Sequence, residues 1–143
     1  MELNKNQLKN ALALNFDRAK IKCFVVSVDE LDEIDKNISC FIAIVNHQPN
    51  YINSGHWSLI FRVSHNIVFY HDPLCLSIPE DIIHFMLSCC KNVLATNLVT
   101  QSLMSNICGY VCQYMCSKLI KNTDLKSVLI SEFYGLTIQE IKI

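Results

Sequence analysis

Three of the chain's eight cysteines lie at four-residue intervals in the segment QSLMSNICGYVCQYMCSKL, residues 101–119. The apolar positions 108, 111, 112, 115, 116, 119 and 120 have helical spacing and predict a helix that begins at Cys108. A cysteine reacts as its thiolate, which the unpaired N–H groups and the dipole of a helix N-terminus stabilise. Cys108 is therefore the candidate nucleophile, whereas Cys112 and Cys116, further along the helix, are predicted to be inert core thiols.

A nucleophilic cysteine also needs a base and a group that orients this base. The segments HWSLIFRV (56–63) and IVFYHDP (67–73) resemble two strands joined by the short turn SHN, which predicts a β-hairpin. His56 begins the first strand and Asp72 ends the second, so antiparallel pairing brings the imidazole and the carboxylate to one end of the sheet. We expect His56 to be the base and Asp72 to fix its tautomer.

The other four histidines are weaker candidates for the base. His65 falls in the predicted turn, His84 falls on a helix face, and His71 points to the opposite strand face from Asp72. His47 lies outside the predicted hairpin. Of the five histidines, only His56 is therefore paired with Asp72 by the predicted hairpin. The sequence therefore favours His56.

Gln101 ends a predicted short strand, ATNLVTQ (95–101), just before the helix of Cys108. Its amide and the backbone N–H of Cys108 would form an oxyanion hole, whose donors are typically worth a few kcal/mol each. Each candidate has an ordinary alternative: a core thiol, a packing histidine and a turn aspartate before Pro73, while Gln101 alone carries no signal. The combination, in the order His, Asp, Gln, Cys, favours a catalytic site. Gly109 would let a substrate approach the backbone beside the nucleophile.

The composition predicts one domain over residues 1–143. Hydrophobic residues make up 51% of the chain and charged residues 17%, which excludes disordered and low-complexity classes. A net charge of -1 without runs of like charge excludes a dedicated nucleic-acid binder. There is no signal-peptide core and no membrane-length apolar run, so we expect an intracellular monomer with reduced thiols. The cysteine spacing does not fit a structural zinc site, and we expect no metal.

The segments together predict an α+β fold, with a small mixed sheet of about four or five strands packed against helices. The acidic stretch 29–35 is expected to be a loop or a short helix. The other predicted elements are helices over 3–14, 80–94 and 124–135 and strands over 23–28 and 39–47.

These motifs resemble those of the adenovirus-protease-like cysteine peptidases, the adenain group, whose wider clan includes the SUMO-specific proteases. AIVN (43–46) before a polar loop and GHW is similar to the segment that leads to the family's catalytic His-Trp. YHDP (70–73) resembles its acidic strand end, and QSLMSNICGYVC (101–112) is similar in spacing to its Gln and Cys-Gly. The resemblance covers nearly the whole chain and implies a mixed sheet packed against the nucleophile's helix.

Carried over residue by residue, the resemblance implies that Cys108 is the nucleophile, His56 the general base, Asp72 its acidic partner and Gln101 the oxyanion donor. Adenovirus enzymes carry Glu at the acidic position, whereas Asp is common in the wider clan. Cys75 stands where the family often has a glycine shortly after the Pro.

The same resemblance implies a viral thiol protease that cleaves virion precursor proteins during maturation, at Gly-containing sites. It would act in the host nucleus or cytoplasm and be packaged in the virion. No cofactor is implied except an activating viral peptide, which in adenovirus enzymes binds partly through a disulfide. Counted back from Gln101, Cys90 falls near the position that takes this bond. Because the chain lacks a basic surplus, we do not expect stimulation by DNA.

Two other functions stay open. One is a protease for ubiquitin-like proteins, a deSUMOylase or deubiquitinase, because diglycine tails would suit a narrow cleft. The other is a catalytically silent domain that binds a partner through the same cleft.

Overall fold

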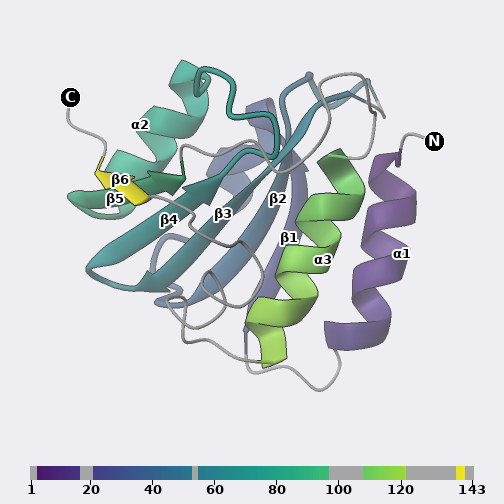
Figure 1. Cartoon of the computed structure of the whole chain (residues 1–143), viewed down its shortest axis with the longest axis horizontal. Coiled ribbons are helices and arrows are strands. Elements are labelled where there is room, and N and C mark those ends of the chain that lie inside the picture. Colours follow the sequence, from purple (N-terminus) through teal and green to yellow (C-terminus); the bar gives the residue numbers. More distant parts are fainter. Residues whose placement is uncertain (1–2, 17–20, 53–54, 97–107, 122–137, 141–143) are drawn as a thin grey trace.

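A six-stranded mixed sheet, with strands in sequence order, forms the centre of the computed structural model, which describes residues 3–16, 21–52, 55–96, 108–121 and 138–140. Two neighbouring pairs, β1 with β2 and β4 with β5, are parallel, and the other three are antiparallel. The strands are β1 (Lys22–Ser27), β2 (Phe41–Asn46), β3 (Trp57–Ser64), β4 (Ile67–His71), β5 (Asn92–Thr96) and β6 (Ile138–Glu140) (Figure 1).

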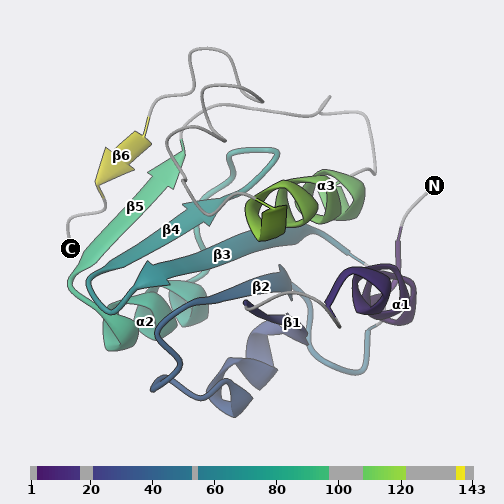
Figure 2. The ribbon, with the colours of Figure 1, turned by 90° about the horizontal axis from the view of Figure 1, so that it is seen from below.

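Helices cover both faces of this sheet. Figure 2 shows α3 on one face, with α1 beside it, and α2 with the 3-10 helix η1 on the other. Parallel neighbours need a crossover connection, and η1 and α2 supply the two crossovers on one face. The bounds are α1 (Lys5–Phe16), η1 (Val28–Glu33), α2 (Glu80–Cys89) and α3 (Cys108–Lys121).

Strand β2 is buried along its whole length because it contributes to two separate cores. Ile42 and Ile44 belong to the core beneath α1 and α3, whereas Phe41, Ala43 and Val45 belong to the core beneath α2. Successive side chains of a strand point to opposite faces, so a strand covered on both sides needs a continuous apolar run. This accounts for the unbroken hydrophobic stretch that predicted a central strand.

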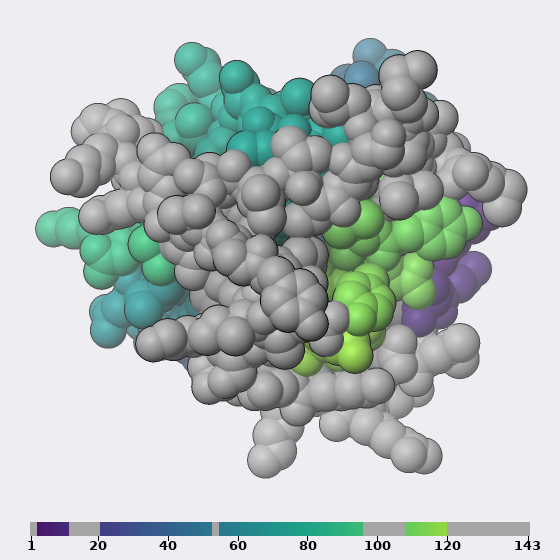
Figure 3. Space-filling model, in the orientation of Figure 1, coloured from purple at the N-terminus to yellow at the C-terminus, as the bar shows by residue number. Residues whose placement is uncertain are grey.

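Helix α3 has one buried and one exposed face. Cys112, Met115 and Cys116 are fully buried on the inner face, as the sequence predicted for the two cysteines. The outer face reaches the surface in Figure 3, with Tyr110 and Tyr114 exposed. The helix therefore presents its first residue, Cys108, at one end of the sheet and uses its later turns to fill the core.

Most of the predicted elements are confirmed. The N-terminal helix, the strands near 23–28 and 39–47, the hairpin and the helix that begins at Cys108 are all present within one or two residues of their predicted bounds. The acidic stretch 29–35 overlaps the short helix η1, which spans Val28–Glu33. The first hairpin strand begins at Trp57 rather than at His56. The predicted helix over 124–135 lies outside the described residues.

Three predictions differ from the structure. The helix predicted over 80–94 ends at Cys89. The strand predicted over 95–101 corresponds to β5, which begins earlier, at Asn92, and is described as far as Thr96, whereas residues 97–101 lie outside the described residues. Val93 packs into the core beneath α2 and Leu94 packs against the opposite core, so the short apolar run alternates between faces as a strand does. The sheet also has six strands rather than four or five, because β6 pairs with β5.

A buried arginine contacts the last residue of α2. Arg62 of β3 is 3% exposed, and its guanidinium donates to the carbonyl oxygens of Ile38 at 3.2 Å and of Cys89 at 2.9 Å. It also donates to the carbonyl of Lys36. The Cys89 carbonyl is one of the terminal groups that a helix leaves without an internal partner. Arg62 therefore binds the end of α2 to the loop before β2.

Candidate active site

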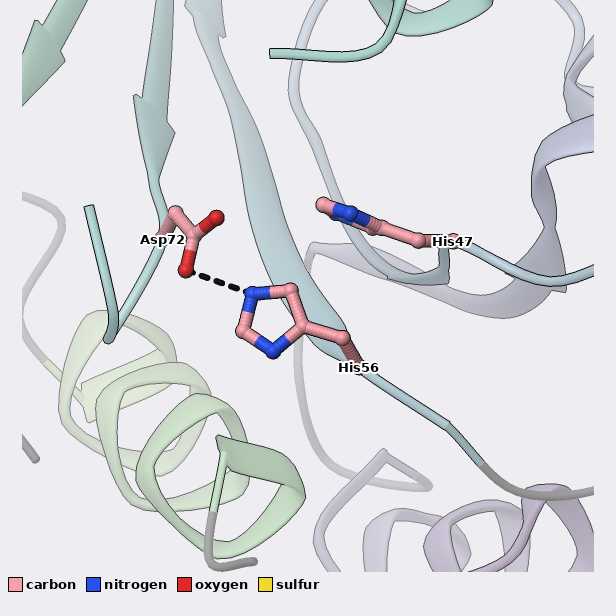
Figure 4. A group of neighbouring side chains, drawn as sticks. All are labelled: His47, His56 and Asp72. Carbon is pink, nitrogen blue, oxygen red and sulfur yellow. Dashed lines mark hydrogen bonds and ion pairs between the residues drawn. The ribbon is translucent and has the colours of Figure 1, made fainter. Parts of the chain in front are cut away.

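His56 and Asp72 lie in direct contact at one end of the sheet. His56 Nε2 is 2.6 Å from Asp72 Oδ1, and the Asp72 side chain is only 2% exposed (Figure 4). An ionised carboxylate can only accept hydrogen bonds, so the proton lies on Nε2. This leaves Nδ1 as the His56 nitrogen that can accept a proton from another group.

The turn that follows β4 holds the Asp72 carboxylate. The backbone N–H of Leu74 donates to Oδ1 at 2.8 Å, and that of Cys75 donates to the Asp72 carbonyl at 2.9 Å. Cys75 has a φ of 53°, in the left-handed region that suits glycine. A glycine would suit this backbone conformation, and this chain forms the turn with a cysteine instead.

Cys108 is the first residue of α3 and is 4% exposed. The backbone N–H of Trp57 donates to its Sγ at 3.3 Å, and the Sγ is 3.7 Å from the carbonyl oxygen of Gly55. The thiol thus lies against the start of β3, next to His56. The Sγ therefore accepts one hydrogen bond, from the Trp57 N–H, and donates a long one to the Gly55 carbonyl oxygen.

The electrostatics of His56 follow from these neighbours. Burial acts most strongly and lowers the pKa of His56, but hydrogen bonds with Asp72 and with Cys108 raise it, and the net result is a pKa of about 9. The charges of Asp72 and Cys108 act in the same direction. His56 therefore carries a proton at neutral pH, as the acid that delivers a proton to a leaving amine must.

Gln101 lies outside the described residues, so its part in an oxyanion hole stays a prediction. The other expected donor, the backbone N–H of Cys108, belongs to the first residue of α3. The first N–H groups of a helix have no partner within the helix. This group is therefore available in principle to an oxyanion at the nucleophile.

Gly109 has a different role from the one that its sequence position suggested. A Cβ added at Gly109 would lie 3.2 Å from the Cβ of Leu3 and 3.3 Å from Cδ1 of Trp57. The space beside the glycine is filled by the protein itself, not left for a substrate. The missing side chain lets α3 pack closely against Trp57, which sets the position of Cys108 relative to β3.

His47 belongs to the site, although the sequence reasoning left it out. Its ring lies edge to face with the ring of His56, with centroids 4.7 Å apart (Figure 4). Its Nε2 is 2.8 Å from Ser58 Oγ and 3.4 Å from the Tyr70 hydroxyl. Burial, followed by the charge of His56, lowers the pKa of His47 to about 4, although Asp72 opposes the shift. His47 is therefore a neutral ring that packs against the charged ring of His56.

A signal for His47 was present in the sequence. The two histidines flank the polar loop 47–55 that joins two predicted strands, and antiparallel pairing places the residues at the two ends of such a loop opposite each other. In the structure the His47 N–H donates to the His56 carbonyl at 2.9 Å, extending the β2–β3 ladder by one residue pair. Only the β3–β4 hairpin entered the sequence argument.

The remaining candidates lie elsewhere. His65 is exposed in the turn after β3 and His84 is exposed on α2. His71 is fully buried, and this burial lowers its pKa to about 4. Cys90 is half-buried where α2 joins β5, with its Sγ 3.2 Å from the carbonyl oxygen of Asn92. The structure does not test a disulfide between Cys90 and a peptide.

Comparison with known proteins does not identify a family. No family model matches the chain, and no curated protein sequence matches it. None of the helices in the described ranges is both long and apolar enough to cross a membrane. The geometry of the site and the order of its motifs are therefore what indicate a function.

Proposed function

We propose that the chain is a cysteine endopeptidase whose nucleophile is Cys108. The observation that carries the proposal is the half-buried imidazole of His56, which lies 2.6 Å from a buried carboxylate and beside the thiol of Cys108. This thiol, at the start of a helix, accepts from the N–H of Trp57, the residue next to His56. This is the arrangement of nucleophile, base and orienting group that covalent catalysis by a thiol requires.

In the proposed reaction the Cys108 thiolate attacks the carbonyl carbon of the scissile peptide bond. The oxyanion that forms accepts hydrogen bonds from the Cys108 N–H and, as predicted, from the Gln101 amide. Protonated His56 then gives its proton to the leaving amine, and the intermediate collapses to a thioester. A water molecule that His56 deprotonates hydrolyses this thioester, which releases the acid product and restores the thiol.

Asp72 and Trp57 support these steps without meeting the substrate. Asp72 holds the Nε2–H of His56 at 2.6 Å, which keeps Nδ1 directed to the nucleophile and stabilises the imidazolium. The Trp57 N–H, 3.3 Å from Sγ, donates to the sulfur and so favours the thiolate. One backbone N–H and one side chain thereby constrain the reacting pair.

We propose virion precursor proteins as the substrates, cut at Gly-containing sites, on the basis of the motif order shared with the adenovirus-protease-like peptidases. Asp72 in place of Glu favours a second candidate, the processing of ubiquitin-like proteins, because the wider clan commonly uses Asp. Incubation with virion precursor proteins and with ubiquitin and SUMO reporters, followed by N-terminal mapping of the cuts, distinguishes the two substrate classes.

Selective alkylation tests whether the chain is an enzyme at all. Cys75 is exposed, whereas Cys108 is 4% exposed, so a reaction governed by access alone would label Cys75 first. Brief treatment of the full chain with iodoacetamide, followed by peptide mass spectrometry, is expected to label Cys108 first. Preferential labelling of Cys75, or equally slow labelling of all eight thiols, would favour a silent binding domain.

A further inference from the structure

Three side chains that suit a metal ion converge beside the nucleophile. His47, His56 and Asp72 each offer one ligand atom, and these atoms lie within 4.8 Å of one another. They come from the ends of three neighbouring strands, β2, β3 and β4, and Figure 4 shows them directed toward a common space. Two imidazoles and one carboxylate form a donor set that zinc uses in open sites with three protein ligands.

One buried oxygen atom of this group, Asp72 Oδ2, lacks a hydrogen-bond partner among the described residues. The other oxygen, Oδ1, accepts from His56 and from the Leu74 N–H. Buried carboxylate oxygens are normally paired with a donor or a cation. A cation bound between Asp72 and the two histidines would satisfy Oδ2.

The surroundings of His47 also suit a ligand. Ser58 is fully buried and Tyr70 is 2% exposed, and both contact His47 Nε2. Metal-binding histidines are usually oriented by a hydrogen bond at one ring nitrogen. Zinc holds nitrogen and oxygen ligands at about 2.0–2.2 Å, so its tetrahedral ligands lie roughly 3.5 Å apart. The three ligand atoms already lie within 4.8 Å of one another, so rotation of the side chains has to adjust their separations toward that spacing when the ion binds.

We propose that His47, His56 and Asp72 bind a zinc-type divalent cation and that this binding switches the site off. The metal would take the His56 Nε2 electron pair, with the Nε2 proton released to solvent and water filling the fourth position. His56 could then no longer alternate between imidazolium and imidazole, so the proton transfers to and from the substrate would stop. The regulatory consequence rests on the proposed function, whereas the binding of the metal ion does not depend on it.

Cobalt binding by the full-length Cys108→Ala variant tests the site without the nucleophile. We expect one equivalent of Co²⁺ to give the visible absorption of a tetrahedral site, without the near-ultraviolet charge transfer that a thiolate ligand produces. Near-ultraviolet bands of that kind would place the metal on the remaining cysteines and overturn the proposal.

Variants in the same background identify the ligands. We expect His47→Gln and Asp72→Asn each to weaken Co²⁺ binding at least tenfold, because each removes one of three protein ligands. The matched control is His65→Gln, in the exposed turn after β3, which should bind as the parent does. Equal binding by His47→Gln and the parent would overturn the proposal. A rise in the thermal midpoint with Zn²⁺, lost in His47→Gln, provides a second measure that also shows each variant to be folded.

The regulatory part is tested with the unaltered chain. Zn²⁺ should inhibit cleavage, a chelator should restore it, and His47→Gln should need at least tenfold more Zn²⁺ for half-inhibition of its own activity. Inhibition that is equally strong in His47→Gln would show zinc acting on Cys108 and His56 alone and would overturn the switch. If the chain cleaves nothing, the proposed function fails, whereas the cobalt result still decides the metal site.

Discussion

The first residue and the inner turns of α3 both carry buried cysteines, but the neighbours of these cysteines differ. Cys108 receives the Trp57 N–H and lies beside His56, whereas Cys116 Sγ lies 4.0 Å from another thiol, that of Cys23. Burial raises the pKa of Cys112 well above its usual value, and the contact with Cys23, followed by burial, raises the pKa of Cys116. Position in the helix, not residue type, separates the proposed nucleophile from the structural thiols.

The largest expected effect comes from removing the thiol at the first residue of α3, compared with removing a thiol from its inner turns. Cys108→Ala should reduce turnover by about four to six orders of magnitude, because it removes the nucleophile, with little change in the thermal midpoint. Cys112→Ala should keep the turnover of the folded protein and lower its stability by about 1 kcal/mol. Cleavage assays and thermal unfolding of both variants would measure this contrast. Equal losses of activity would show that the two thiols do not differ as described.

Asp72→Asn should have the next largest effect, because it disturbs the base that only Cys108 uses. We expect a fall in kcat of about two to four orders of magnitude, since an amide can hold the wrong tautomer of His56. Burial lowers the pKa of His56, and Asp72 and Cys108 raise it to about 9, so wild-type activity should decline as the pH rises through that value. The decline should move to lower pH in Asp72→Asn, and an unmoved pH profile would contradict the role given to Asp72.

Cys112→Ser should have a moderate effect on stability alone. The side chain is fully buried, so a hydroxyl there would lose water without a matched partner, at a cost of about 1–3 kcal/mol. Denaturant unfolding measures the loss, with Cys112→Ala as the reference for the missing sulfur. A serine that costs no more than the alanine would show that the inner turns are less apolar than the structure indicates.

The smallest expected effect lies away from α3, at the ion pair that joins Lys5 of α1 to Glu30 of η1. The two side chains are 2.7 Å apart, and the hydrogen bond from Lys5, the largest cause, lowers the pKa of Glu30. Glu30→Gln should cost about 0.5 kcal/mol, because solvent screens such a pair. This contribution should be present above the ordinary pKa of glutamate, 4.5, and fade as the pH falls below it. Unfolding at pH 7 and at pH 3 tests the sign, and catalysis should not change at pH 7.

The parts of the site that the sequence predicted are those set by local patterns. The helical period fixed the start of α3 at Cys108, and one tight turn determined the hairpin that brings His56 to Asp72. His47 depends on the pairing of β2 with β3 across a longer loop, and the sequence reasoning did not extend the register that far. The end of α2 depends on Arg62, which contacts the Cys89 carbonyl from another strand. Such a contact has no local signature.

Trp57 is the only tryptophan in the sequence, and it lies at the candidate site. Its backbone N–H contacts the nucleophile, and its fully buried indole donates to the Leu3 carbonyl at 3.1 Å. All tryptophan emission of the chain therefore originates next to Cys108. The protein carries a built-in fluorescent reporter, which can follow acylation of the thiol or release of the N-terminal segment in real time, without a label.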